Sequence, residues 1–109
     1  MKVVNLETFR KLPACTVFMK YEPYVFGGLQ IKGDTWKTDF LSKNITYEPR
    51  CVKGCDFVSM YTMAEHTKED IQLDFDCLGR DGCYDEEQLF AVYSRQDVKM
   101  LVATLTECL

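Results

Sequence analysis

Turn signals break the N-terminal half of this chain into short runs, and they limit what the chain can fold into. Between residues 16 and 41 the turn-forming pairs are Glu22-Pro23, Gly27-Gly28 and Gly33-Asp34. Proline has no backbone N–H to give to a sheet, and glycine tolerates the positive φ that tight hairpins need. The intervening runs, such as "TVFMKY" and "LQIK", have the β-branched, aromatic or alternating character of strands. This half of the chain therefore predicts short antiparallel strands.

The beginning of the chain predicts a short helix. Asn5 can cap it, Leu6 and Phe9 fall on one face, and Pro13 ends it.

The end of the chain predicts a longer, amphipathic helix. Ser94 and Asp97 have the spacing of a capping box. Four apolar residues then follow the i, i+3, i+4, i+7 pattern: Val98, Leu101, Val102 and Leu105. We expect this helix to pack one face against the sheet.

The middle of the chain is less regular. The segment "FVSMYTM" (residues 57–63) is strand-like in composition, but a helix over residues 58–65 is also possible, because its apolar residues fit either period. "DIQLDF" (residues 70–75) alternates apolar and polar side chains and predicts a half-buried strand with an acidic outer face. "QLFAVY" (residues 88–93) predicts another short strand. The 109 residues suit a single domain. We predict an α+β fold: a small, bent antiparallel sheet or partly open barrel of five or six strands, with one helix at each end.

Composition and charge exclude several classes of protein. The chain is 47% hydrophobic and 28% charged, as in ordinary globular domains. It has no run of about 20 apolar residues, and its N-terminus lacks the apolar stretch of a signal peptide. We therefore expect a cytoplasmic protein with no membrane partner. Its six cysteines are expected to stay reduced.

The charge is unevenly distributed along the chain. Residues 65–87 contain nine acidic and two basic side chains, whereas residues 1–64 contain nine basic and six acidic ones. An acidic stretch repels a phosphate backbone, so we expect no direct nucleic-acid binding. The same stretch would attract a basic protein surface, although a solvated acidic face is the alternative.

We find no pattern that indicates catalysis or a cofactor. Two pairs of cysteines could supply four thiolates to a zinc ion: Cys51 and Cys55, and Cys77 and Cys83. Neither pair has the CxxC spacing of ribbon-type zinc sites, so we expect no metal. His66 is the only histidine, and no sequence motif places a nucleophile beside it. We expect a non-enzymatic protein without a cofactor.

Three stretches carry a resemblance to known proteins. "LPACTVFMKYEPYVFGGLQIKGDTW", "DF" and "GRDGCYDEEQLFAVYSRQDVKML" resemble the KYEPxxFGxLxIKG and RDGxYDEEQLFAVY patterns of a group of small bacteriophage and prophage proteins. The resemblance covers most of the chain and is weakest over residues 42–70. No activity is carried over from the group. It implies a host bacterial cytoplasm, where small phage proteins commonly block a defence system.

Two sets of residues are candidates for binding. The set for a host protein with a basic surface is Tyr21, Glu22, Tyr24, Asp74, Asp76, Asp85 and Glu86. The set for a small ligand is Lys20, Lys32, Asp34, Arg80 and Asp81.

These candidates support three functional hypotheses. The first is a phage-type inhibitor, for example an anti-CRISPR protein, that binds a host defence protein through an acidic and aromatic surface. The second is a sponge that sequesters a nucleotide immune signal, and the third is a structural or housekeeping module. A homo-oligomer is compatible with each of them.

Overall fold

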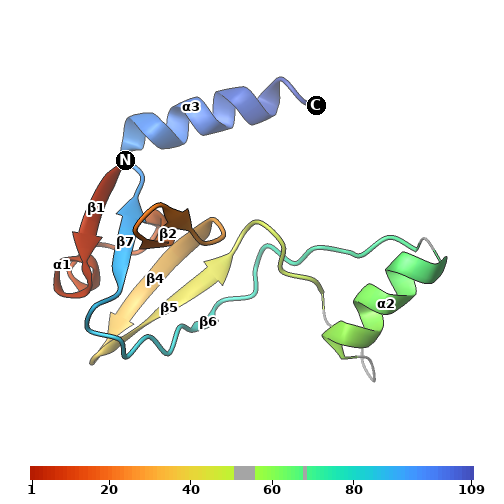
Figure 1. The fold of residues 1–109 in the computed structure, drawn as a ribbon. Coiled ribbons are helices and arrows are strands. Elements are labelled where there is room, and N and C mark those ends of the chain that lie inside the picture. Colours follow the sequence, from red (N-terminus) through yellow and green to blue (C-terminus); the bar gives the residue numbers. More distant parts are fainter. Residues whose placement is uncertain (51–55, 68) are drawn as a thin grey trace.

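The computed structural model describes residues 1–50, 56–67 and 69–109. In this part of the chain, three helices accompany one antiparallel sheet of seven strands (Figure 1). In chain order the elements are β1 (Lys2–Asn5), α1 (Leu6–Arg10), β2 (Val17–Glu22), β3 (Val25–Phe26), β4 (Gln30–Trp36), β5 (Asp39–Asn44), α2 (Phe57–Thr67), β6 (Gly79–Arg80), β7 (Leu89–Val92) and α3 (Arg95–Thr106). The predicted α+β class is confirmed. The sheet is open, and it has more strands than the five or six predicted.

The strand order places the first and the last strand of the chain side by side. It is β1-β7-β2-β4-β5-β6, with β3 added to β2. Strand β7 lies between β1 and β2, so Ala91 is opposite both Val3 and Met19. Short local turns cannot produce this insertion, because β7 follows β2 by more than 60 residues.

A cluster of phenylalanines under α1 forms the core. Phe9, on α1, is fully buried, and its ring centroid lies 4.0 Å from that of Phe90 and 4.7 Å from that of Phe18. Phe40 closes the cluster from β5, with its centroid 5.0 Å from Phe9. The Asn5 side chain accepts a hydrogen bond from the backbone N–H of Thr8 at 2.9 Å, which confirms the predicted cap.

The turn predicted at Gly33-Asp34 is wrong. At Gly27-Gly28, where a hairpin or a bulge was predicted, the pairing with β2 shifts by one residue between β3 and β4, as in a bulge. The hairpin turns lie at Pro23-Tyr24 and Lys37-Thr38, and Tyr24 and Lys37 adopt positive φ. Gly33 instead lies within β4, at a shift in register. A Cβ on Gly33 would lie 2.8 Å from the Leu41 Cβ, and one on Gly28 would lie 2.7 Å from the Tyr47 ring. These glycines therefore provide close packing rather than reversal of the chain.

Residues 45–78, here called the arm, leave the sheet between β5 and β6 and carry α2 away from it (Figure 1). The helix considered possible over residues 58–65 is confirmed as α2. The strand predicted over residues 70–75 is wrong, since a single bridge joins Leu73 to Pro49. Leu73 and Phe75 are 42% and 52% exposed, so the apolar face of this alternating segment is only partly covered.

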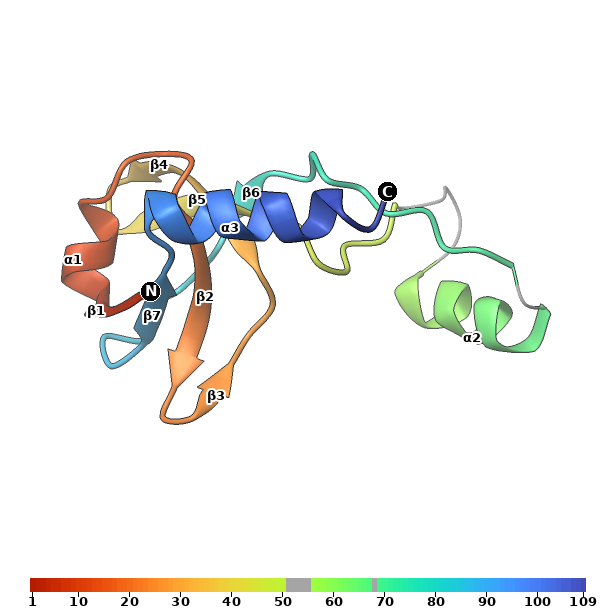
Figure 2. The same cartoon turned by 90° about the horizontal axis from the view of Figure 1, so that it is seen from above.

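Helix α3 has the predicted capping box but not the predicted packing. The Ser94 side chain accepts from the Asp97 N–H, and the Asp97 carboxylate accepts from the Ser94 N–H. All of α3 is described, and none of its residues is buried. Figure 2 shows α3 running across one end of the sheet, with its C-terminal end on the same side as the arm. A capping box determines where a helix starts, whereas its packing depends on the direction in which the preceding strand ends.

Across residues 1–50, 56–67 and 69–109, none of the helices combines the length and the apolar character that crossing a bilayer requires.

Candidate binding surface

The candidate ligand residues Lys20, Arg80 and Asp81 come together beside the core. Lys20 Nζ lies 2.9 Å from Asp81 Oδ2, and the Ser42 hydroxyl donates to Asp81 Oδ1 at 3.2 Å. The Asp81 side chain is only 5% exposed. Because β2, β5 and the chain after β6 each contribute to these contacts, the ion pair connects three parts of the sheet.

Asp39 is a buried carboxylate that the sequence analysis did not select. Its Oδ2 accepts from Arg80 Nε at 3.0 Å, and its Oδ1 accepts from the backbone N–H groups of Phe40 at 2.8 Å and Gly82 at 3.0 Å. Burial alone would raise the pKa of Asp39, but these hydrogen bonds and the Arg80 charge together hold it below its ordinary value. Asp39 therefore anchors the chain after β6 to β5 as a carboxylate.

Trp36 lies between two cations at the end of β4. Arg80 lies 5.2 Å and Lys37 4.8 Å from the centroid of the ring. A pocket of about 310 Å³ beside the ring is lined by Asp34 and Arg80 among others. The Arg80 guanidinium donates to Asp39 and to the Tyr84 hydroxyl, and its other N–H groups belong to a side chain that is 58% exposed.

Lys32 is buried, in contrast to its predicted role as a ligand-binding residue. Its Nζ donates to the Gly33 carbonyl at 3.0 Å and to the Thr35 hydroxyl at 2.8 Å, and it lies 5.9 Å from the centroid of the Phe9 ring. Burial lowers the pKa of the Lys32 ammonium, although the nearby Asp34 carboxylate opposes this change. These contacts support the irregular part of β4 from inside the protein.

Tyr21, Glu22 and Tyr24 lie at the tip of the β2–β3 hairpin. Tyr24 is 93% exposed, and its backbone N–H donates to the Tyr21 hydroxyl at 3.3 Å. The Tyr21 ring packs on Phe26 at 5.1 Å between centroids. The tip thus presents aromatic side chains to solvent at a position that the sequence indicated.

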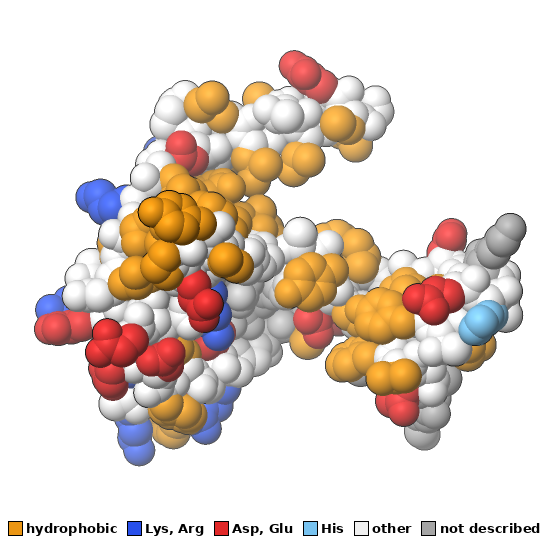
Figure 3. Space-filling view, in the orientation of Figure 1, with side chains coloured by type: hydrophobic (Ala, Val, Ile, Leu, Met, Phe, Trp, Pro, Cys, Tyr) orange, Lys and Arg blue, Asp and Glu red, His pale blue; other side chains and the backbone are white. Residues whose placement is uncertain are grey.

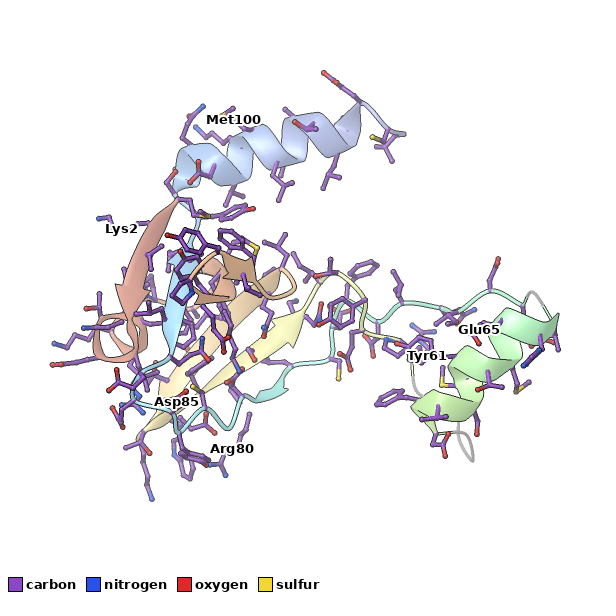
Figure 4. All side chains as sticks on the ribbon, viewed as in Figure 1. Lys2, Tyr61, Glu65, Arg80, Asp85 and Met100 are labelled. Carbon is purple, nitrogen blue, oxygen red and sulfur yellow. The ribbon has the colours of Figure 1, made fainter. Side chains whose placement is uncertain are left out.

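The acidic stretch of residues 65–87 does not form a single surface. Figure 4 labels Asp85 on the body of the protein, below the sheet, and Glu65 on α2 at the far end of the arm. Asp74 and Asp76 also belong to the arm, and Asp76 is almost fully exposed, 3.8 Å from Lys43 Nζ. Asp85 and Glu86 lie in the connection from β6 to β7. The predicted partner-binding acids therefore belong to two regions.

The arm exposes a large set of apolar side chains that sequence reasoning assigned to no site. Figure 3 shows hydrophobic side chains over much of α2. The exposed members on the arm are Tyr47, Phe57, Val58, Tyr61, Met63, Leu73, Phe75 and Leu78, and their exposed fractions range from 41% to 75%. The sequence does hold a signal for this surface: the arm is rich in apolar residues, but they follow no regular helical spacing and no partner strand could be predicted for them.

Metal binding and thiol chemistry gain no support from the described residues. There, no group of three or more His, Cys, Asp or Glu side chains is arranged to hold a metal ion. Cys83 is buried in the core and Cys77 is exposed, and neither forms a disulfide. Cys51 and Cys55 lie outside the described residues, so the zinc hypothesis that includes them is untested.

The fold and these contacts define an open α+β sheet protein with a projecting arm. Comparisons with protein-family models, with curated proteins and with solved structures find no match to this chain.

Proposed function

We propose that this chain is a non-catalytic binding protein that docks on a partner protein with a basic surface, and that the arm is its main contact. The observation that carries the proposal is the combination of exposed aromatic and apolar side chains with Asp74 and Asp76 on one projecting segment. Large exposed apolar patches with aromatic residues and methionine are typical of protein interfaces. Acidic side chains among them favour a basic partner and oppose binding to a phosphate backbone.

The resemblance to small bacteriophage proteins suggests which partner to test. Under this proposal the partner is a bacterial defence protein, for example a CRISPR effector, which carries basic surfaces to hold nucleic acid. The chain would then inhibit the effector by occupying such a surface in the host cytoplasm. The Tyr24 tip would add a second contact.

Reversing the arm's charge tests the proposal. We expect the D74K/D76K variant to bind its partner at least about a hundredfold more weakly, since like charges facing each other across an interface cost several kcal/mol. Tagged wild-type chain is used to capture the partner from a bacterial lysate, and the affinities of the purified pair are then compared by biolayer interferometry. The matched control is D85K/E86K, which makes the same charge change on the body.

Comparing the two variants shows whether binding depends on the charges of the arm in particular or on the net charge of the whole protein. Loss of binding in D74K/D76K with near wild-type binding in D85K/E86K supports the arm as the contact. Equal affinity of D74K/D76K and the wild-type chain contradicts the proposal, and so does an equal loss in both variants.

The alternative of a nucleotide sponge has less physical support. Among the described residues, its candidate cations are already engaged: Lys20 with Asp81, Arg80 with Asp39, and Lys32 inside the protein. Freeing Lys20 or Lys32 for a phosphate would break an existing contact, whereas Arg80 is 58% exposed and keeps N–H donors outside its bonds to Asp39 and Tyr84. A thermal-shift panel of cyclic and ADP-ribose-derived nucleotides tests this hypothesis, because a ligand of the folded state raises the melting temperature.

A further inference from the structure

Helix α3 presents an apolar stripe beside an open groove. The stripe consists of Val98, Leu101, Val102 and Leu105, and both Val102 and Leu105 are 57% exposed. A groove of about 850 Å³ runs between α3 and the segment that joins α1 to β2. Leu12, Pro13 and Val17 line its far side, opposite Val98 and Val102. Figure 3 shows hydrophobic side chains along the side of α3 that faces the body.

The flanks of the stripe can also be buried at low cost. The hydroxyls of Thr104 and Thr106 donate to the carbonyls of Met100 and Val102, at 2.8 and 2.7 Å. With their donors engaged inside the helix, these threonines can present their methyl groups to a neighbour. A polar group that is already hydrogen-bonded loses little when water is excluded.

The chain exposes more surface than a compact monomer of its size. Its accessible area is 8008 Å², whereas a 12.7 kDa monomer is expected to expose about 6,200 Å². Its radius of gyration is 15.7 Å, compared with about 13 Å for a compact domain of this length. The arm and α3 share this excess of roughly 1,800 Å². A standard interface removes about 800 Å² from each partner, so the excess is large enough for a stable dimer.

We propose that α3 mediates a homodimer, in which each α3 lies in the groove of the other copy and the two stripes pack together. Val98, Val102 and Leu105 are spaced 4 and 3 apart within α3, which is the spacing of helices that pack along a common seam. A two-fold axis brings the same surface of each copy into contact.

The charges around α3 favour a second copy over a strongly charged partner. The charged residues that line the groove are Arg95 and Lys99, whereas Glu107 lies at the C-terminal end of α3. The α3 of a second copy therefore brings an acidic side chain and the negative end of a helix that can face these two cations. Both basic residues, Arg95 and Lys99, lie in the N-terminal half of α3. An antiparallel pair keeps them at opposite ends of the interface, whereas a parallel pair would bring them together. The dimer is therefore antiparallel.

The oligomeric state tests the proposal directly. Sedimentation equilibrium is measured from about 1 to about 100 µM, a range that covers micromolar dissociation constants. We expect the wild-type chain to approach twice 12.7 kDa. The V102E/L105E variant is expected to raise the dissociation constant at least about a hundredfold, because two carboxylates would be buried in an apolar interface.

Met100→Glu is the matched control on the same helix. Met100 is 60% exposed and lies outside the stripe, so this variant should still dimerise. Circular dichroism verifies that all three proteins remain folded, which is expected since the substituted positions are exposed. The proposal is overturned if the wild-type chain stays monomeric throughout the range, if V102E/L105E dimerises as the wild type does, or if Met100→Glu disrupts the dimer equally.

Discussion

Replacing Phe9 with alanine is expected to lower the free energy of unfolding by about 3–5 kcal/mol. Phe9 is fully buried, stacks on Phe90 and contacts the rings of Phe18 and Phe40. Removing such a ring costs about 3–5 kcal/mol through lost burial and the cavity that remains. The total free energy of unfolding of a domain this size is about 5–15 kcal/mol. One substitution therefore removes a large share of it.

Urea denaturation followed by Trp36 fluorescence measures this effect, because the chain has one tryptophan. The control is Phe75→Ala, which deletes the same ring from a side chain on the arm that is 52% exposed. Its effect on the free energy of unfolding should stay within about 0.5 kcal/mol. Equal losses from the two variants would mean that the phenylalanine cluster is not the main core.

Replacing Asp39 with asparagine is expected to lower the free energy of unfolding by about 2–3 kcal/mol, the range for hydrogen bonds to a charged group. The Asp39 carboxylate accepts from Phe40, Gly82 and Arg80, and an amide nitrogen in place of one oxygen would face a donor. Arg80 is largely exposed and can be solvated, which limits the loss. Hydrogen exchange should show faster exchange of the Gly82 N–H. Exchange at the wild-type rate would contradict this anchoring role.

The same carboxylate makes a defined contribution to the pH dependence of stability. The pKa of Asp39 is lower in the folded state than in the unfolded chain, so its contribution is complete above the unfolded pKa of about 3.9 and is lost as the pH falls through the folded pKa. Urea titrations at pH 7 and at steps below pH 4 should therefore show the difference between wild type and Asp39→Asn shrinking as the solution becomes more acidic. Asp34→Asn serves as the control, since Asp34 is exposed and does not accept these bonds. A difference that stays constant over this range would assign the effect of the substitution to packing.

The elements that sequence patterns predicted well are those that depend on near neighbours. The Asn5 cap, the Ser94–Asp97 capping box and the strand character of residues 17–22 all act within a few residues. The wrong predictions involve partners that are distant in the chain. The alternation of residues 70–75 required a neighbouring strand, and within residues 1–50, 56–67 and 69–109 its pairing is the single bridge from Leu73 to Pro49. The apolar stripe of α3 correctly indicated a helix but not what would cover it.

The candidate site residues show the same difference between near and distant partners. Tyr24 could be placed at an exposed turn because Pro23 precedes it. The sequence could not predict that Lys20 and Arg80 form ion pairs, because β pairing brings each of them near a distant carboxylate. Lys20 pairs with Asp81, and Arg80 pairs with Asp39, which is 41 residues away in the chain. Whether a lysine or arginine is available to a ligand depends on such distant partners.

For this protein, the amino-acid sequence by itself determined the α+β class, both helix caps, most strand segments and the acidic excess of residues 65–87, because each follows from local backbone preference or from composition. Only the tertiary structure decided that β7 lies between β1 and β2, that Asp39 and Asp81 are buried with their partners, and that the arm and α3 project with apolar surface uncovered. The physical reason is that burial and ion pairing depend on which distant segments the folded sheet brings together.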